Sequence, residues 1–112
     1  MALTLLLRCR DLAETREFYR SALGFDVRDT AEGTVTAERS GDILVFTASD
    51  LWGGPPGLSG TIYFTVADVD GRYARVKDKA TVAWPLQAMP YGSREFGIRD
   101  SNGYHLAFRQ QA

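Results

Sequence analysis

The chain has 112 residues, of which 45% are hydrophobic and 24% charged; this fits one folded, soluble domain and excludes both intrinsic disorder and a second large domain. A net charge of −1 argues against binding nucleic acid by neutralising phosphates, and no apolar run approaches the ~20 residues of a membrane-spanning helix. The one cysteine, Cys9, cannot form an internal disulfide, and we expect no signal peptide, so the expected location is the cytoplasm.

The first half of the chain predicts a strand, a helix and three more strands. Residues 3–8 alternate between an apolar face and a mixed face, as in a strand. Asp11 is placed to cap a helix whose apolar residues recur at helical spacing, and Gly24 is placed to end it. The three strands that follow are predicted over Phe25–Asp29, Thr34–Arg39 and Ile43–Ala48.

A loop rich in glycine and proline, Ser49–Ser59, divides the chain, and after it the same order of elements returns. Thr61–Val66 reads as an apolar strand. Asp68 is placed to cap a short helix marked by apolar residues from Val69 to Ala80. The last three strands are predicted over Val82–Leu86, Arg94–Arg99 and Tyr104–Arg109.

The two halves also repeat in their residues. Gly41–Phe46 and Gly103–Phe108 share the pattern G-x-x-L-x-F and close each half, while Asp11 and Asp68 each open a helix. The sequence therefore predicts an α+β fold of two βαβββ modules, the first over about residues 1–50 and the second over about residues 59–112. Together they are expected to form one domain over residues 1–112.

Two stretches carry a resemblance to a known family. RCRDLAETREFYRSALGF (Arg8–Phe25) and PYGSREFGIRDSNGYHLAF (Pro90–Phe108) resemble the vicinal-oxygen-chelate superfamily of glyoxalases, dioxygenases, fosfomycin-modifying enzymes and bleomycin-resistance binding proteins. Ser101 stands where that family usually has proline, in a turn. The resemblance implies paired modules whose curved mixed sheets form a cup, commonly completed by dimerisation. In length and in its Gly-Ser-Arg-Glu-Phe segment, the chain is most similar to the bleomycin-resistance type.

The resemblance also implies four metal-ligand positions, one on each of four strands. They fall on Thr4, Val45, Thr61 and Ala107, which offer no imidazole, carboxylate or thiolate. The chain has a single histidine and a single cysteine, and it has neither a nucleophile elbow nor a phosphate-binding loop. We therefore predict no metal, no cofactor and no catalytic residue.

Strand alternation predicts which side chains line the cup. If Thr4 faces inward, Tyr63 faces inward too, whereas Leu3, Leu5 and Leu7 pack beneath the helices. Two tryptophans and a tyrosine are placed in loops or at strand ends, where they would rim the cup. The predicted ligand-contacting residues are Thr4, Leu6, Arg8, Val45, Trp52, Thr61, Tyr63, Trp84, Tyr91, Glu95, His105 and Ala107.

Several of these residues also have a purely structural interpretation. Tyr63 would serve equally in ordinary sheet packing, and Trp52 in anchoring a loop or a dimer contact. A lone histidine such as His105 usually satisfies a local hydrogen bond. Glu95 is an equally good candidate for a buried ion pair with Arg8 or Arg94.

The function predicted from the sequence is that of a metal-free, cytoplasmic homodimer. It would bind and sequester an aromatic, partly polar small molecule in a cleft shared between subunits, as an antibiotic-resistance-type binding protein. Glu95, Arg8 and the threonines would orient the ligand. The alternative is a metal-independent lyase or isomerase that uses His105 or Glu95 as its acid–base group. A third interpretation is an interaction module that has lost an enzyme's activity.

Overall fold

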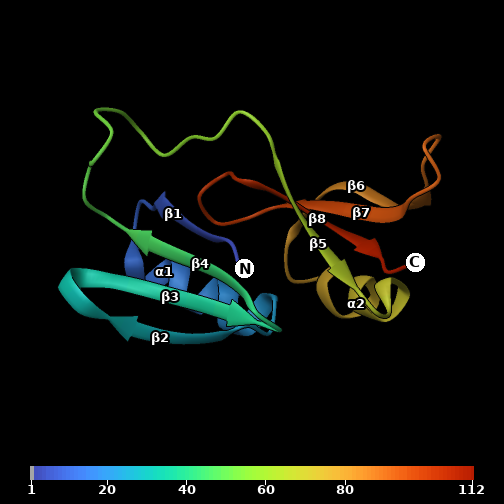
Figure 1. Ribbon diagram of the computed structural model, residues 1–112, viewed down its shortest axis with the longest axis horizontal. Coiled ribbons are helices and arrows are strands. Elements are labelled where there is room, and N and C mark those ends of the chain that lie inside the picture. Colours follow the sequence, from blue (N-terminus) through green and yellow to red (C-terminus); the bar gives the residue numbers. More distant parts are fainter. Residues whose placement is uncertain (1) are drawn as a thin grey trace. The chain divides into compact units, whose positions relative to one another are not determined.

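The computed structural model describes residues 2–112, which form two compact units that divide between Gly57 and Leu58. We call residues 2–57 module 1 and residues 58–112 module 2. The elements (Figure 1) are β1 (Thr4–Arg8), α1 (Leu12–Glu17), the π-helix η1 (Phe18–Ala22), β2 (Asp26–Thr30), the 3-10 turn η2 (Ala31–Gly33), β3 (Thr34–Arg39), β4 (Asp42–Thr47), β5 (Thr61–Val66), α2 (Val69–Val76), β6 (Thr81–Ala88), β7 (Arg94–Arg99) and β8 (His105–Gln110). None of the helices in the described residues has the length and apolar character needed to span a membrane.

The two modules share one topology. Module 1 holds a four-stranded sheet in the order β1-β4-β3-β2, and module 2 holds one in the order β5-β8-β7-β6. In each sheet the first strand pairs in parallel with the last strand of the module, and the remaining pairs are antiparallel. The prediction of an α+β fold with two βαβββ modules is therefore confirmed.

In module 1 the helix begins where the sequence predicts. The Asp11 carboxylate accepts a hydrogen bond from the backbone N–H of Glu14 at 2.8 Å, and the helical segment ends before Gly24, whose φ of +73° favours glycine. Tyr19 is fully buried on this helix and packs at 4.8 Å between ring centroids against Phe46 of β4. The prediction that Leu3 packs beneath the helix is wrong, because Leu3 precedes β1 and is 74% exposed.

In module 2 the helix α2 is shorter than predicted. Asp68 caps it by accepting from the backbone N–H of Gly71 at 3.0 Å, but the helix ends at Val76 and Ala80 lies beyond it. The three residues between Val76 and Ala80 are exposed and charged, so they add nothing to the apolar helix face that packs on the sheet. A stack of aromatic rings forms the core between α2 and its sheet, and its members are Phe64, Tyr73, Phe96 and Phe108.

The sheet of module 2 has a second face, opposite α2, which we call the distal face. Residues that alternate with the buried core point to it, because successive side chains of a strand point to opposite sides. The side chains of β5, β8 and β7 on this face are Thr61, Tyr63, Thr65, His105, Ala107, Arg109, Glu95 and Arg99, with Gly97 between them.

Candidate functional site

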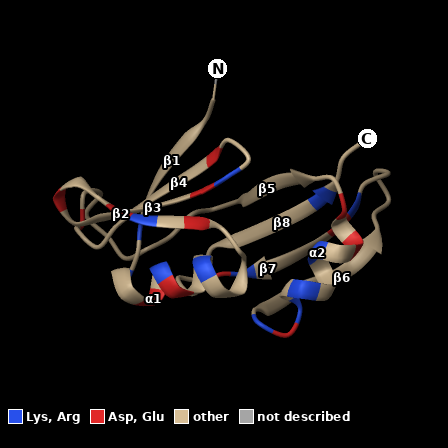
Figure 2. Ribbon diagram, turned by 90° about the horizontal axis from the view of Figure 1, so that it is seen from below, with Lys and Arg blue, Asp and Glu red and all other residues tan. Residues whose placement is uncertain are grey.

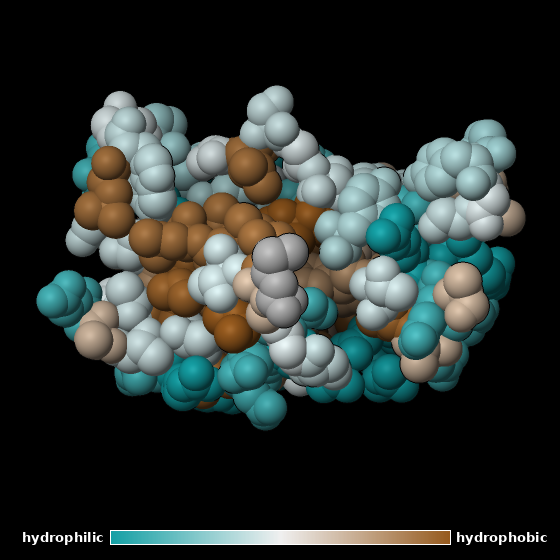
Figure 3. Space-filling model, viewed as in Figure 1, coloured by the Kyte–Doolittle hydropathy of each residue, from teal (hydrophilic) through white to brown (hydrophobic). Residues whose placement is uncertain are grey.

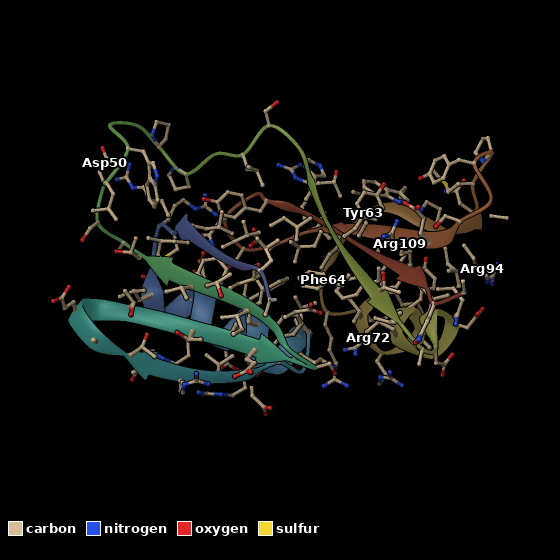
Figure 4. The ribbon with its side chains drawn as sticks, viewed as in Figure 1. Asp50, Tyr63, Phe64, Arg72, Arg94 and Arg109 are labelled. Atoms are coloured by element: carbon tan, nitrogen blue, oxygen red, sulfur yellow. The ribbon has the colours of Figure 1, made fainter. Side chains whose placement is uncertain are left out.

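One row of register partners runs across the distal face. It has a large aromatic residue at each end and two small residues between them. The strand register aligns Tyr63 on β5 with Ala107 on β8, Ala107 with Gly97 on β7, and Gly97 with Trp84 on β6. Tyr63 is 43% exposed, whereas its neighbour Phe64 is 5% exposed and lies in the core. The predicted alternation of this strand therefore agrees with the structure, and Figure 4 shows the two rings on different sides of β5.

Trp84 does not lie in a loop or at a strand end, as the sequence predicts, but inside β6. Val82 pairs with Ile98 and Trp84 with Gly97, so β6 carries one extra residue here, and a second register shift follows before Gln87. Such a bulge turns the next side chain to the other face of the sheet. Alternation from Val82 would place Trp84 on the α2 side, and the bulge places it on the distal face instead.

The indole of Trp84 lies flat against the backbone of Gly97. A Cβ atom at position 97 would overlap the six-membered ring of this indole, so only glycine allows the contact. The ring of His105, one row away on β8, is nearly parallel to the indole, with 6.4 Å between centroids and 15° between planes. Trp84 and His105 thus present an aromatic surface on the sheet.

Glu95 holds this surface in place. Its carboxylate is fully buried and accepts one hydrogen bond at each oxygen, from the indole N–H of Trp84 at 3.2 Å and from the Tyr91 hydroxyl at 2.8 Å. The Tyr91 side chain is also hydrogen-bonded to that of Tyr63, and this bond, followed by the one to Glu95, raises the pKa of Tyr91 above its ordinary value of 10. The four side chains Tyr63, Tyr91, Glu95 and Trp84 therefore form one continuous network.

The predicted ion pair between Glu95 and Arg94 is wrong. Arg94 points to the α2 side of the sheet, where its guanidinium binds the Asp70 carboxylate at 2.6 Å. Adjacent residues of a strand face opposite ways, so Arg94 and Glu95 cannot share a face. Arg8, the other predicted partner, forms its ion pair with Asp50 at 3.5 Å.

The predicted site residues divide between the modules. Module 2 brings together Tyr63, Trp84, Tyr91, Glu95, His105 and Ala107, with Thr61 paired in register with His105. Thr4, Leu6, Arg8 and Val45 lie on β1 and β4 of module 1, where Leu6 and Val45 are register partners. Trp52 lies in the loop after β4 and is 55% exposed.

The sequence predicts the loop after β4 but not the role of Asp50 in fixing its backbone. One oxygen of the Asp50 carboxylate accepts hydrogen bonds from the backbone N–H groups of Trp52, Gly53 and Gly54 at 2.6–3.1 Å. Arg8 donates to the carbonyl of Gly54 and pairs with Asp50. These N–H groups, Gly54 foremost, lower the pKa of Asp50 below its ordinary value of 3.8. The sequence signal was an aspartate followed by small residues, which is typical of an Asx turn.

Acid is expected to release this loop. Because the folded state lowers the pKa of Asp50, the stabilisation it gives is present above pH 3.8 and is lost as the pH falls through the lowered value. Trp52 emission, recorded in a Trp84→Phe background, should therefore change below about pH 4. In Asp50→Asn that transition should be absent, and an identical transition in both proteins would contradict the assignment.

Comparison with known proteins identifies the family of this chain. A family model described as the glyoxalase/bleomycin resistance protein/dioxygenase superfamily matches residues 2–108. The chain belongs to this superfamily. No curated protein matches the sequence significantly.

Several solved structures share the fold. A superfamily member from Sphaerobacter thermophilus superposes with a TM-score of 0.81 at 21% identity, covering 99% of this chain and 97% of that one. A member from Alicyclobacillus acidocaldarius gives 0.79 at 24% identity, with 98% and 90% covered. TioX from Micromonospora sp. ML1 gives 0.77 at 21% identity, with 100% and 97% covered. At these identities the likeness concerns the fold alone.

The metal that the superfamily implies does not fit the residues of this member. The four corresponding positions carry Thr4, Val45, Thr61 and Ala107, and none of these side chains supplies the imidazole, carboxylate or thiolate that a transition metal needs. Across residues 2–112 no three His, Cys, Asp or Glu side chains lie close enough to share a metal ion. The residues at these positions therefore do not fit a bound transition metal.

Proposed function

We propose that this superfamily member binds a planar aromatic, partly polar small molecule on the distal face of module 2, without a metal. One observation carries the proposal: the Trp84 indole lies on Gly97 and is fixed by Glu95, while Tyr63 is exposed on the same row. Flat aromatic surfaces of this kind bind other flat rings by offset stacking and by excluding water.

The energetics of the network favour binding. The side chains of Trp84 and Tyr91 are already ordered by their hydrogen bonds to Glu95, so little conformational entropy is lost when a ligand packs against them. Tyr91 is 63% exposed and Tyr63 is 43% exposed, which leaves a large aromatic area in water. A ligand that covers these rings gains the free energy of burying that area.

Binding without turnover fits Glu95 better than catalysis does. Both of its oxygens are occupied by donors from the protein, and the residue is fully buried, so its geometry suits the positioning of aromatic rings. The alternative hypothesis is a metal-independent lyase or isomerase that uses His105 or Glu95 for proton transfer. Product formation by the purified protein would favour that alternative.

We also propose that the protein sequesters its ligand, and that it does so as a cytoplasmic homodimer of the bleomycin-resistance type. Exposed leucines on module 1 support self-association: Leu3, Leu6 and Leu51 all expose much of their side chains, and apolar groups gather over this module in Figure 3. β1, which carries Leu6, is also an edge strand. A second copy of the chain would cover both features.

Tyr63→Ala tests the proposed function. Native mass spectrometry of gently purified protein should reveal a co-purified small molecule, whose affinity is then measured by calorimetry. Loss of the ring is expected to weaken binding by about 1–3 kcal/mol, from stacking and lost apolar contact. Tyr63→Phe keeps the ring and removes only the hydroxyl bound to Tyr91, so it should weaken binding less than Tyr63→Ala does. Unchanged affinity in Tyr63→Ala would refute stacking on this face.

A further inference from the structure

Arg109 is held on the distal face by neutral partners. It is exposed near the end of β8, its Nε–H donates to the Thr65 hydroxyl at 3.1 Å, and its guanidinium carbon lies 5.4 Å from the centroid of the Tyr63 ring. Figure 4 shows Arg109 beside Tyr63. The cation–π contact with Tyr63 and the hydrogen bond at Nε together restrict the orientation of the guanidinium.

Within the described part of the chain Arg109 has no acidic partner, although the strand register places a carboxylate next to it. Glu95 on β7 is the register partner of Arg109 on β8, yet both Glu95 oxygens accept from Trp84 and Tyr91. Among residues 2–112 no carboxylate forms an ion pair with Arg109. Basic and acidic residues are interspersed along the ribbon in Figure 2, and other arginines do pair with a carboxylate, namely Arg8, Arg10, Arg16, Arg28 and Arg94.

Arg109 is therefore available to bind an oxyanion. Nε is occupied, and the two terminal amino groups remain to donate a pair of parallel hydrogen bonds, which matches the two oxygens of a carboxylate. A guanidinium that is already oriented loses less rotamer freedom on binding than a free surface arginine. Glu95 offers no free oxygen for direct contact with a ligand cation, because its carboxylate is buried and already bonded at both oxygens.

We infer that the ligand is an aromatic carboxylate, with its ring against Tyr63 and Trp84 and its carboxylate on Arg109. This inference rests on the proposed function and adds the charge of the ligand to it. It also sets the direction of selectivity on the distal face: anionic aromatic molecules are favoured over neutral ones, and cationic aromatic molecules are disfavoured.

The test compares three probes of the same ring and different charge, measured by isothermal titration calorimetry: 2-naphthoate, neutral 2-naphthamide and cationic 2-naphthylmethylammonium. The wild-type protein should bind 2-naphthoate roughly tenfold tighter than 2-naphthamide, as a charge-assisted bidentate contact implies. In Arg109→Gln that ratio should fall to about one while 2-naphthamide still binds, and Arg109→Lys should restore part of it.

Arg94→Gln is the matched control. It removes one positive charge from the other side of the same sheet, where Arg94 binds Asp70, and it should keep the wild-type ratio. Of the three probes, only 2-naphthoate should bind more weakly when the salt concentration is raised. Equal binding of all three probes, or a preference for the cation, would overturn the inference and leave the proposed aromatic site standing. Failure of every probe to bind the folded wild-type protein would overturn the proposed function and the inference with it.

Discussion

Phe64→Ala is expected to lower the free energy of unfolding by about 3–5 kcal/mol, because it opens a cavity in the aromatic core of module 2. The Phe64 ring is buried and stacks on Phe108 at 5.4 Å between centroids, and Phe108 in turn stacks on Phe96 at 5.2 Å. Removing the Phe64 ring takes away the contact on that side of Phe108. Urea denaturation followed by far-UV circular dichroism measures the loss.

The adjacent residue provides the control for this prediction. Tyr63→Ala removes a ring of similar size from the exposed face of the same strand, so its cost in stability should stay near 1 kcal/mol, the scale of one hydrogen bond and one exposed cation–π contact. The reverse order of the two losses would show that the side chains of β5 face the opposite way.

Gly97→Ala is expected to have the second large effect, on stability and on the binding face together. The added methyl group would overlap the Trp84 indole, so the ring must leave the sheet, at a cost of about 1–3 kcal/mol for the overpacked contact. The displaced indole also withdraws its hydrogen bond from the buried Glu95 carboxylate, which adds about 1–3 kcal/mol. In a Trp52→Phe background, the emission of Trp84 should shift to longer wavelength, and binding to the distal face should weaken.

Two comparisons isolate the contact between position 97 and the indole. In a Trp84→Ala background, Gly97→Ala should cost little, because the ring that the methyl group would strike is gone; a cost as large as in the wild type would show that the strain lies elsewhere. Gly54→Ala is the matched glycine control, since a Cβ there meets open space and that substitution should be nearly neutral.

The fold could be predicted because both signals that specify it are local. Apolar alternation marks β5 and β8, and the aspartates at positions 11 and 68 cap their helices as the sequence suggests. The same alternation places Tyr63 on the distal face and Phe64 in the core. Where the local signal is weak the prediction fails: Ala80 follows a charged segment that ends the helix early, and Leu3 precedes the paired part of its strand.

The candidate site could be predicted only in part, because its arrangement depends on contacts across strands. The bulge that turns Trp84 onto the distal face depends on how β6 pairs with β7, and the residues of β6 alone do not reveal it. For Glu95, the alternative of a buried ion pair assumed that the carboxylate needs a cation. It is instead satisfied by an indole N–H and a phenol hydroxyl, which are neutral donors.

The irregular path of β6 also bears on how the protein avoids aggregation. β6 is an edge strand of its sheet, and an edge with a regular row of free backbone groups invites strands from other molecules to add to it. Pro85 removes one backbone donor from this edge, and two register shifts on either side of Trp84 disturb its spacing. The bulge that turns Trp84 onto the distal face therefore also makes this edge a poor template for intermolecular β-sheet growth, so one irregularity of β6 contributes both to the proposed site and to protection of the edge.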